Sequence, residues 1–100
     1  MTIMLPPGVQ HIRRFCVAGA DNERGMTVKL LKGGFDPRPQ VMRHLRDEVA
    51  VLEINSGPYC ETVEIAETHR TVGDRHRTLS VDIRAQGFAS VSLVAIEVSY

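Results

Sequence analysis

The sequence has little of what several functional classes require. Its 100 residues include no tryptophan, only five aromatic side chains and two cysteines, and twelve basic side chains are balanced by twelve acidic ones. A neutral chain lacks the positive field that nonspecific binding to nucleic acid or anionic membranes requires. Five aromatic residues are also too few for a broad platform on which bases stack. The composition therefore disfavours nucleic acid as a partner, although a local basic cluster could still contact it.

Long apolar runs are missing as well. The run over residues 1–5 ends at Pro6, too early for a signal peptide, and no run approaches the ~20 apolar residues that cross a bilayer. We therefore expect a cytoplasmic protein without a membrane partner. In that reducing compartment, Cys16 and Cys60 are expected to be free, buried thiols, because both occur in strand-like apolar contexts.

The length and composition fit one folded domain. Apolar residues make up 43% of the chain and charged residues 24%, which is ordinary for a globular protein. One hundred residues leave no room for a second core. We expect a single domain over residues 1–100, with residues 1–8 as a flexible lead-in.

Alternation of apolar and polar residues is the clearest pattern and begins at residue 79. The apolar set is Leu79, Val81, Ile83 and Ala85, followed after Gly87 by Ala89, Val91 and Leu93. A period of two predicts two half-buried strands joined by a turn at Gly87, with Ile83 facing Val91. A third strand over residues 59–69 is expected to pair with the first of them through a loop centred on Asp74, which sets Glu64 opposite Arg84. Residues 59–100 are thus predicted to form a three-stranded meander.

The first half of the chain predicts a hairpin and a helix. Strand-like segments flank a turn rich in Gly, Asp and Asn over residues 19–25, which indicates a β-hairpin over residues 10–32. Asp36 and Pro37 suit the cap and first turn of a helix. Apolar residues then recur on one helical face: Val41, Met42, Leu45, Val49 and Leu52. Residues 49–55 fit either the end of this helix or a short strand, and we favour a helix that ends near residue 48.

These elements predict an α+β fold. It consists mainly of antiparallel sheet, with an N-terminal hairpin, a C-terminal three-stranded meander and one amphipathic helix. The alternative is a small β-barrel or sandwich with one helix.

The parity of the alternation changes after Leu93. From there the apolar set is Val94, Ile96, Val98 and Tyr100. A second apolar face needs a cover, and a terminal strand can pair with a symmetry mate, so these four residues are a candidate homodimer interface. Alternatively, a bulge near Leu93 returns the same side chains to the core.

The remaining candidate site is a basic cluster around the predicted hairpin tip. It comprises Arg70, Arg75, His76 and Arg77, which could contact an anion or a protein partner, although charged loop tips are commonly just solvated. No closely spaced Cys/His set or catalytic constellation is recognisable, so we expect no metal, cofactor or catalytic residue.

Two functions remain from the sequence. We favour a small non-enzymatic binding protein, a homodimer that occupies a surface on another macromolecule. The alternative is a small-ligand-binding protein or enzyme with a pocket between helix and sheet or at the dimer seam, where Tyr59, Cys60 and Arg84 are candidate pocket groups.

Overall fold

The structure is a β-sandwich. A computed structural model describes residues 2–35, 44–72 and 78–100. The strands are β1 (Thr2–Met4), β2 (His11–Gly19), β3 (Met26–Phe35), β4 (His44–Ile54), β5 (Tyr59–Glu64), β6 (Thr78–Ala85) and β7 (Leu93–Ser99). The one helical segment among these described ranges is a three-residue 3-10 turn, Glu67–His69.

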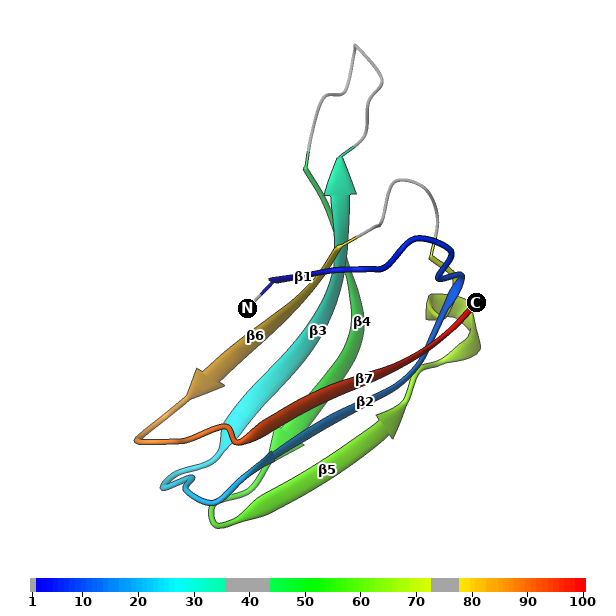
Figure 1. Ribbon diagram of the computed structural model, residues 1–100. Coiled ribbons are helices and arrows are strands. Elements are labelled where there is room, and N and C mark those ends of the chain that lie inside the picture. Colours follow the sequence, from blue (N-terminus) through cyan, green and yellow to red (C-terminus); the bar gives the residue numbers. More distant parts are fainter. Residues whose placement is uncertain (1, 36–43, 73–77) are drawn as a thin grey trace.

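The strands form two antiparallel sheets packed in layers (Figure 1). Sheet A has the order β1-β6-β3-β4, and sheet B has the order β5-β2-β7. Their inner faces meet in one hydrophobic core. Its fully buried side chains come from both layers and include Ile12, Phe15, Leu30, Ile65 and Leu79. Each sheet therefore turns one face inward, which is the physical origin of the period-two pattern in the sequence.

The predicted helix is absent, and the α+β class is therefore wrong. The beginning of that segment, residues 36–43, lies outside the described residues, and the part from His44 to Ile54 is strand β4, paired antiparallel along β3. Val49, Val51 and Ile54 are β-branched and fit a pleated surface better than a helix. Pairing with β3 also supplies the backbone hydrogen bonds that a helix would have made internally. The alternative sandwich is wrong in the same respect, because it too assumed a helix.

The predicted strand pairings are also wrong, and the predicted strands are only partly confirmed. β6 forms at the alternation that begins at Leu79, but most of the next predicted strand, up to Leu93, lies in the connection over residues 86–92, and the strand predicted over residues 59–69 ends as β5 at Glu64. β2 and β3, expected as a hairpin, lie in different sheets, and β5, β6 and β7 lie in sheets B, A and B. The meander assumed that successive strands pair, whereas these connections cross from one layer to the other. Glu64 consequently lies opposite Arg14 rather than Arg84.

The change of parity after Leu93 reflects a change of sheet. In β6, Leu79 and Val81 are buried, whereas in β7 the residues packed against the core are Val94, Ile96 and Val98. Residues 86–92 connect the two strands, so no single strand has to be apolar on both faces. The segment expected as a flexible lead-in contains β1, which pairs with residues 78–80 of β6.

Buried polar groups fasten the loops at one end of the sandwich. The Asn22 side chain donates from Nδ2 to the Asn55 carbonyl at 2.9 Å and accepts from the Gly25 amide at 3.0 Å. The buried Tyr59 hydroxyl donates to the Ser90 carbonyl at 2.7 Å. These bonds connect the loops over residues 20–25, 55–58 and 86–92, and each satisfies a polar group that would otherwise be costly to bury.

The Tyr59 hydroxyl predicts a dependence of stability on alkaline pH. Burial raises its pKa above the ordinary value of 10.0. The unfolded chain therefore loses this proton first, so the stabilisation is complete below pH about 10 and falls as pH rises through the higher folded-state pKa. Urea unfolding at several pH values from about 8 to about 11 should show a shallower loss for Tyr59→Phe than for the wild type. Tyr100→Phe, at an exposed position, is the control and should keep the wild-type slope. Identical slopes for the wild type and Tyr59→Phe would contradict the prediction.

Candidate interaction surface

The sandwich is open along the side where β7 lies opposite β1 and β6, and the surface there is lined from both sheets. Sheet A contains four strands and sheet B three. β7 forms an edge of sheet B and pairs only with β2 among the described strands. In sheet A, the edge strand β1 pairs only with residues 78–80 of β6 and leaves the rest of that strand without a described neighbour on this side. On this side the inner rows of β6 and β7 are only partly covered, since Ile83 is exposed and Val94, Ile96 and Val98 are half-buried.

Two adjoining grooves follow this open side. One of about 250 Å³ runs between Ile3, Leu79 and the β7 row of Val94, Ile96 and Val98. The other, of about 410 Å³, continues past Ile83, Val91 and Leu93 and shares Ile3 and Val94 with the first. We call the surface formed by these eight apolar residues the open seam.

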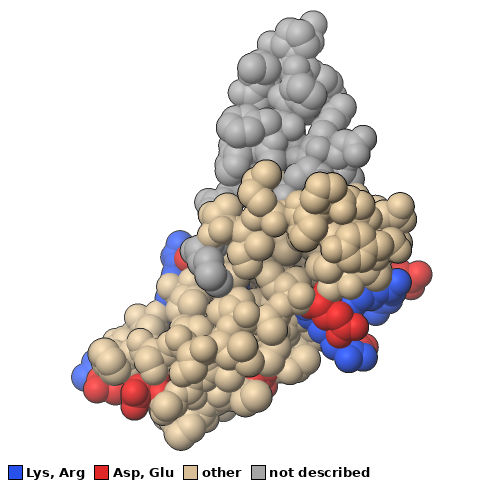
Figure 2. All heavy atoms as spheres, viewed as in Figure 1, with Lys and Arg blue, Asp and Glu red and all other residues tan. Residues whose placement is uncertain are grey.

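The open seam is uncharged and partly exposed. Within the described ranges, Ser92 is the only residue with a polar side chain that lines either groove. In Figure 2 the area between β1, β6 and β7 carries no charged side chain, and the visible charges lie at its margins. Leu93 is 50% exposed, Val91 38% and Ile83 37%. Contiguous apolar surface of this kind commonly marks an interaction site.

The structure brings together three of the four predicted interface residues. Val94, Ile96 and Val98 lie side by side in the open seam, half-buried. Tyr100 lies apart from them, is 73% exposed, and places its ring over Gly8, where an added Cβ would lie 3.3 Å from Tyr100 Cδ2. The row therefore packs partly against the core and also borders solvent, so its burial by a second chain stays a prediction.

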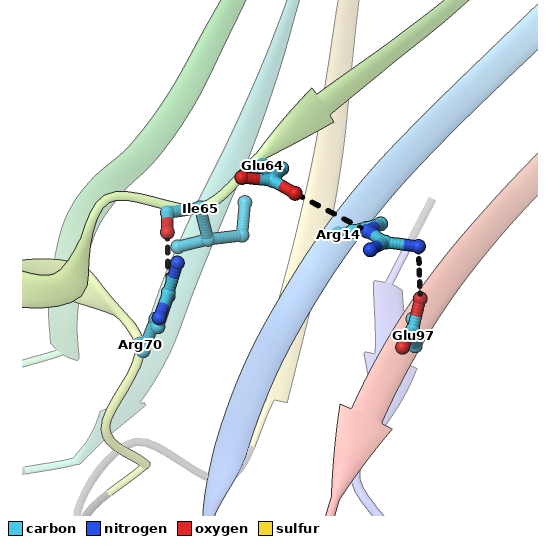
Figure 3. Close-up of polar contacts among 5 residues, drawn as sticks. All are labelled: Arg14, Glu64, Ile65, Arg70 and Glu97. Carbon is cyan, nitrogen blue, oxygen red and sulfur yellow. Dashed lines mark hydrogen bonds and ion pairs between the residues drawn. The ribbon is translucent and has the colours of Figure 1, made fainter.

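The predicted basic cluster falls mostly outside the described residues. Arg75, His76 and Arg77 belong to that undescribed part of the chain. Arg70 is described, and its Nε donates to the Ile65 carbonyl at 2.7 Å, as Figure 3 shows. This bond ties the segment after β5 to the 3-10 turn, which gives Arg70 a role in the fold. A contact between the cluster and an anion or a protein stays a prediction.

Sequence reasoning missed an ion-pair cluster on the outer face of sheet B. Arg14 lies between Glu64 at 3.6 Å and Glu97 at 3.4 Å, on the strands flanking β2 (Figure 3). All three side chains are more than half exposed, and such pairs contribute about 0–1 kcal/mol each. No local signal could have found the cluster, because it depends on β5 and β7 both pairing with β2.

The residues proposed for a ligand pocket are not brought together. Tyr59 is buried and bonded to Ser90, Cys60 is exposed on sheet B, and Arg84 lies on sheet A beside Asp82, 3.6 Å away. Arg84 does line a polar cleft of about 470 Å³ with Arg24, Thr27 and Glu53. Thr27 Oγ1 donates to Glu53 Oε2 there at 2.9 Å, so these groups already satisfy each other. A pocket between helix and sheet is wrong, since the predicted helix is absent.

The described residues show no metal site. Nowhere in them do three or more His, Cys, Asp or Glu side chains gather in a way that could hold a metal ion. Cys16 and Cys60 are free, as predicted, but neither is buried as expected: Cys16 is half-buried and Cys60 is exposed. No helix in the described part of the chain is long and apolar enough to cross a membrane.

Comparison with known proteins assigns no function. The chain matches no protein-family model, no curated protein sequence and no solved structure. The open seam is therefore the feature from which a function can be argued.

Proposed function

We propose that this protein is a small non-enzymatic binding module that occupies a surface on another macromolecule through its open seam. The observation that carries the proposal is a groove of apolar side chains bordered by the edge of β7 that pairs with no other described strand. Removing apolar surface from water drives association, at roughly 25 cal/mol per Å². The backbone edge of β7 adds hydrogen-bonding groups that an extended chain can satisfy.

The character of the seam favours a macromolecule over a small ligand. Ligand sites enclose the ligand and place several polar groups that fix its orientation. The seam is open along its length, and Ser92 has the only polar side chain among the lining residues that the structure describes. An enzyme would need a nucleophile or a base with a suitable pKa within reach of its substrate, and none of the described residues that line the seam has a titratable side chain.

Site-specific photo-cross-linking in the native host tests this proposal. Val91, 38% exposed, lies in the seam, whereas Val51, 41% exposed, lies on the outer face of sheet A. The two positions thus match in residue type and exposure and differ in location. A photo-reactive amino acid at Val91 should yield discrete cross-linked protein species, and one at Val51 should yield none. Equal yields at both positions, or none at Val91, would refute binding through the seam.

A further inference from the structure

β7 is the edge strand that lacks protection against pairing. Natural edge strands are kept from pairing by short length or by charged residues, especially charges on the inward face. β1 has three residues, and β5 carries Glu61 opposite the buried Val17, hence on its inner face. β4 includes Asp47, Glu48 and Glu53. β7 has seven residues, and its inner row is entirely apolar.

We propose that β7 of a second copy of this chain fills the open seam, with the two strands antiparallel about a two-fold axis at Ile96. This inference rests on the proposed function, because it names the macromolecule that the seam binds. Sheet B would then continue from one copy into the other. The apolar rows of the two β7 strands would lie side by side, and each would cover apolar surface that the other leaves open.

Side-chain parity and charge select this register. Opposite residues in an antiparallel pair share a face, so the apolar rows meet only when a residue lies opposite its own copy. An axis at Ile96 pairs all seven residues of β7 and sets Ala95 opposite Glu97 of the second copy. An axis at Glu97 would oppose two carboxylates, which is unfavourable. An axis at Ala95 would pair only residues 93–97 and leave Val98 without a partner.

The charge on β7 is compatible with this pairing. Glu97 lies on the outer face, and its Oε2 is 3.4 Å from Arg14 Nη1 of its own chain. The ion pair is half-exposed, so pairing of the two strands buries no isolated charge. In the proposed register, Glu97 of one copy lies opposite Ala95 of the other, a small neutral residue on the same outer face. Substitutions at Ala95 therefore probe the contact between copies without entering the core.

A matched pair of variants at Ala95 tests the inference. Sedimentation and light scattering over a range of concentrations should show a reversible dimer for the wild type. Ala95→Glu places a like charge opposite Glu97 twice per dimer and should weaken dimerisation about 2- to 30-fold, whereas Ala95→Lys should keep or strengthen it. A wild type that stays monomeric throughout, or equal effects of Glu and Lys, would overturn the inference.

Cysteine cross-linking tests the register separately. In a Cys16→Ala, Cys60→Ser background, Ile96→Cys should form a disulfide-linked dimer on mild oxidation, because residue 96 lies opposite its own copy. Val98→Cys should not, since Val98 lies opposite Val94 and the two copies of residue 98 are then far apart. Circular dichroism checks that both variants fold. Cross-linking at 98 but not at 96 would overturn this register.

The outcomes separate the inference from the proposed function. If the protein is monomeric and Val91 cross-links to a different protein, the proposed binding function stands, but the inference that a second copy fills the open seam is wrong. A dimer insensitive to charge at Ala95 and to cysteine at residue 96 also overturns the pairing. Absence of any cross-link from Val91 would instead remove the proposed function itself.

Discussion

Truncation of Phe15 to alanine should lower the free energy of unfolding by about 3–5 kcal/mol. Phe15 lies in the middle of β2, is 0% exposed, and is the largest of the fully buried side chains in the described residues. In the register of sheet B it lies between Val63 of β5 and Ile96 of β7. Removing its ring leaves a cavity walled by two sheets, and close-packed cores collapse only partly around such a cavity. Chemical denaturation followed by circular dichroism measures the loss.

Ile83→Ala is the informative comparison. The meander predicted from the sequence placed Ile83 at the centre of the core, facing Val91. In the sandwich it is 37% exposed at the open seam, so its truncation removes less buried surface and leaves no closed cavity. We expect a loss of about 1 kcal/mol, clearly below that of Phe15→Ala. Equal losses in the two variants would contradict the layered arrangement.

The sequence could locate strands because their signal is local. Local patterns predicted strand-like segments on both sides of the turn over residues 19–25 and a strand that begins at residue 79, and the structure has β2, β3 and β6 there. The same pattern cannot say which strands pair. A buried row reports only that one face is covered, and the cover can be a neighbouring strand in the same sheet or a strand in the facing layer. The hairpin and the meander were wrong for this reason.

The helix prediction was wrong because the local sequence preference for a helix disagrees with the long-range preference for strand pairing. Asp36 and Pro37 match a helix start, and Val49 and Leu52 match a helical face, yet the segment over residues 44–54 pairs with β3. Long-range pairing routinely overrides such weak local preferences. For a related reason, the sequence pointed to only one part of the open seam. Its β7 row stands out in the local pattern, whereas Ile3 and Ile83 join it only through sheet A.

Replacement of Gly19 by alanine should cost about 2–6 kcal/mol, through overpacking and a broken buried hydrogen bond. Gly19 ends β2 at the point where the Tyr59 hydroxyl donates to the Ser90 carbonyl. A Cβ on Gly19 would overlap the Ser90 carbonyl oxygen and lie 2.6 Å from the Tyr59 hydroxyl oxygen. One is a backbone atom and the other belongs to a buried ring, so neither can move aside without shifting the loop over residues 86–92.

Gly87→Ala is the matched control for this change. The nearest atoms that its Cβ would meet lie on the exposed side chains of Arg24 and Glu23, at 3.3 Å, and flexible side chains can yield. We expect a change within about 0.5 kcal/mol. If Gly19→Ala accumulates no folded protein while Gly87→Ala does, the expected order is met in its extreme form. Equal stabilities of the two variants would mean that the close approach at Gly19 is not structurally required.

A double variant separates the two causes of the Gly19 effect. Gly19→Ala and Tyr59→Phe each remove the bond between Tyr59 and Ser90, so their costs should overlap. The double variant should then be more stable than the sum of the single losses predicts, because neighbouring residues that share a partner are not additive. Denaturation midpoints of the wild type, both single variants and the double variant complete this cycle. Strict additivity would show that Gly19→Ala acts through backbone crowding alone, with the tyrosine bond left intact.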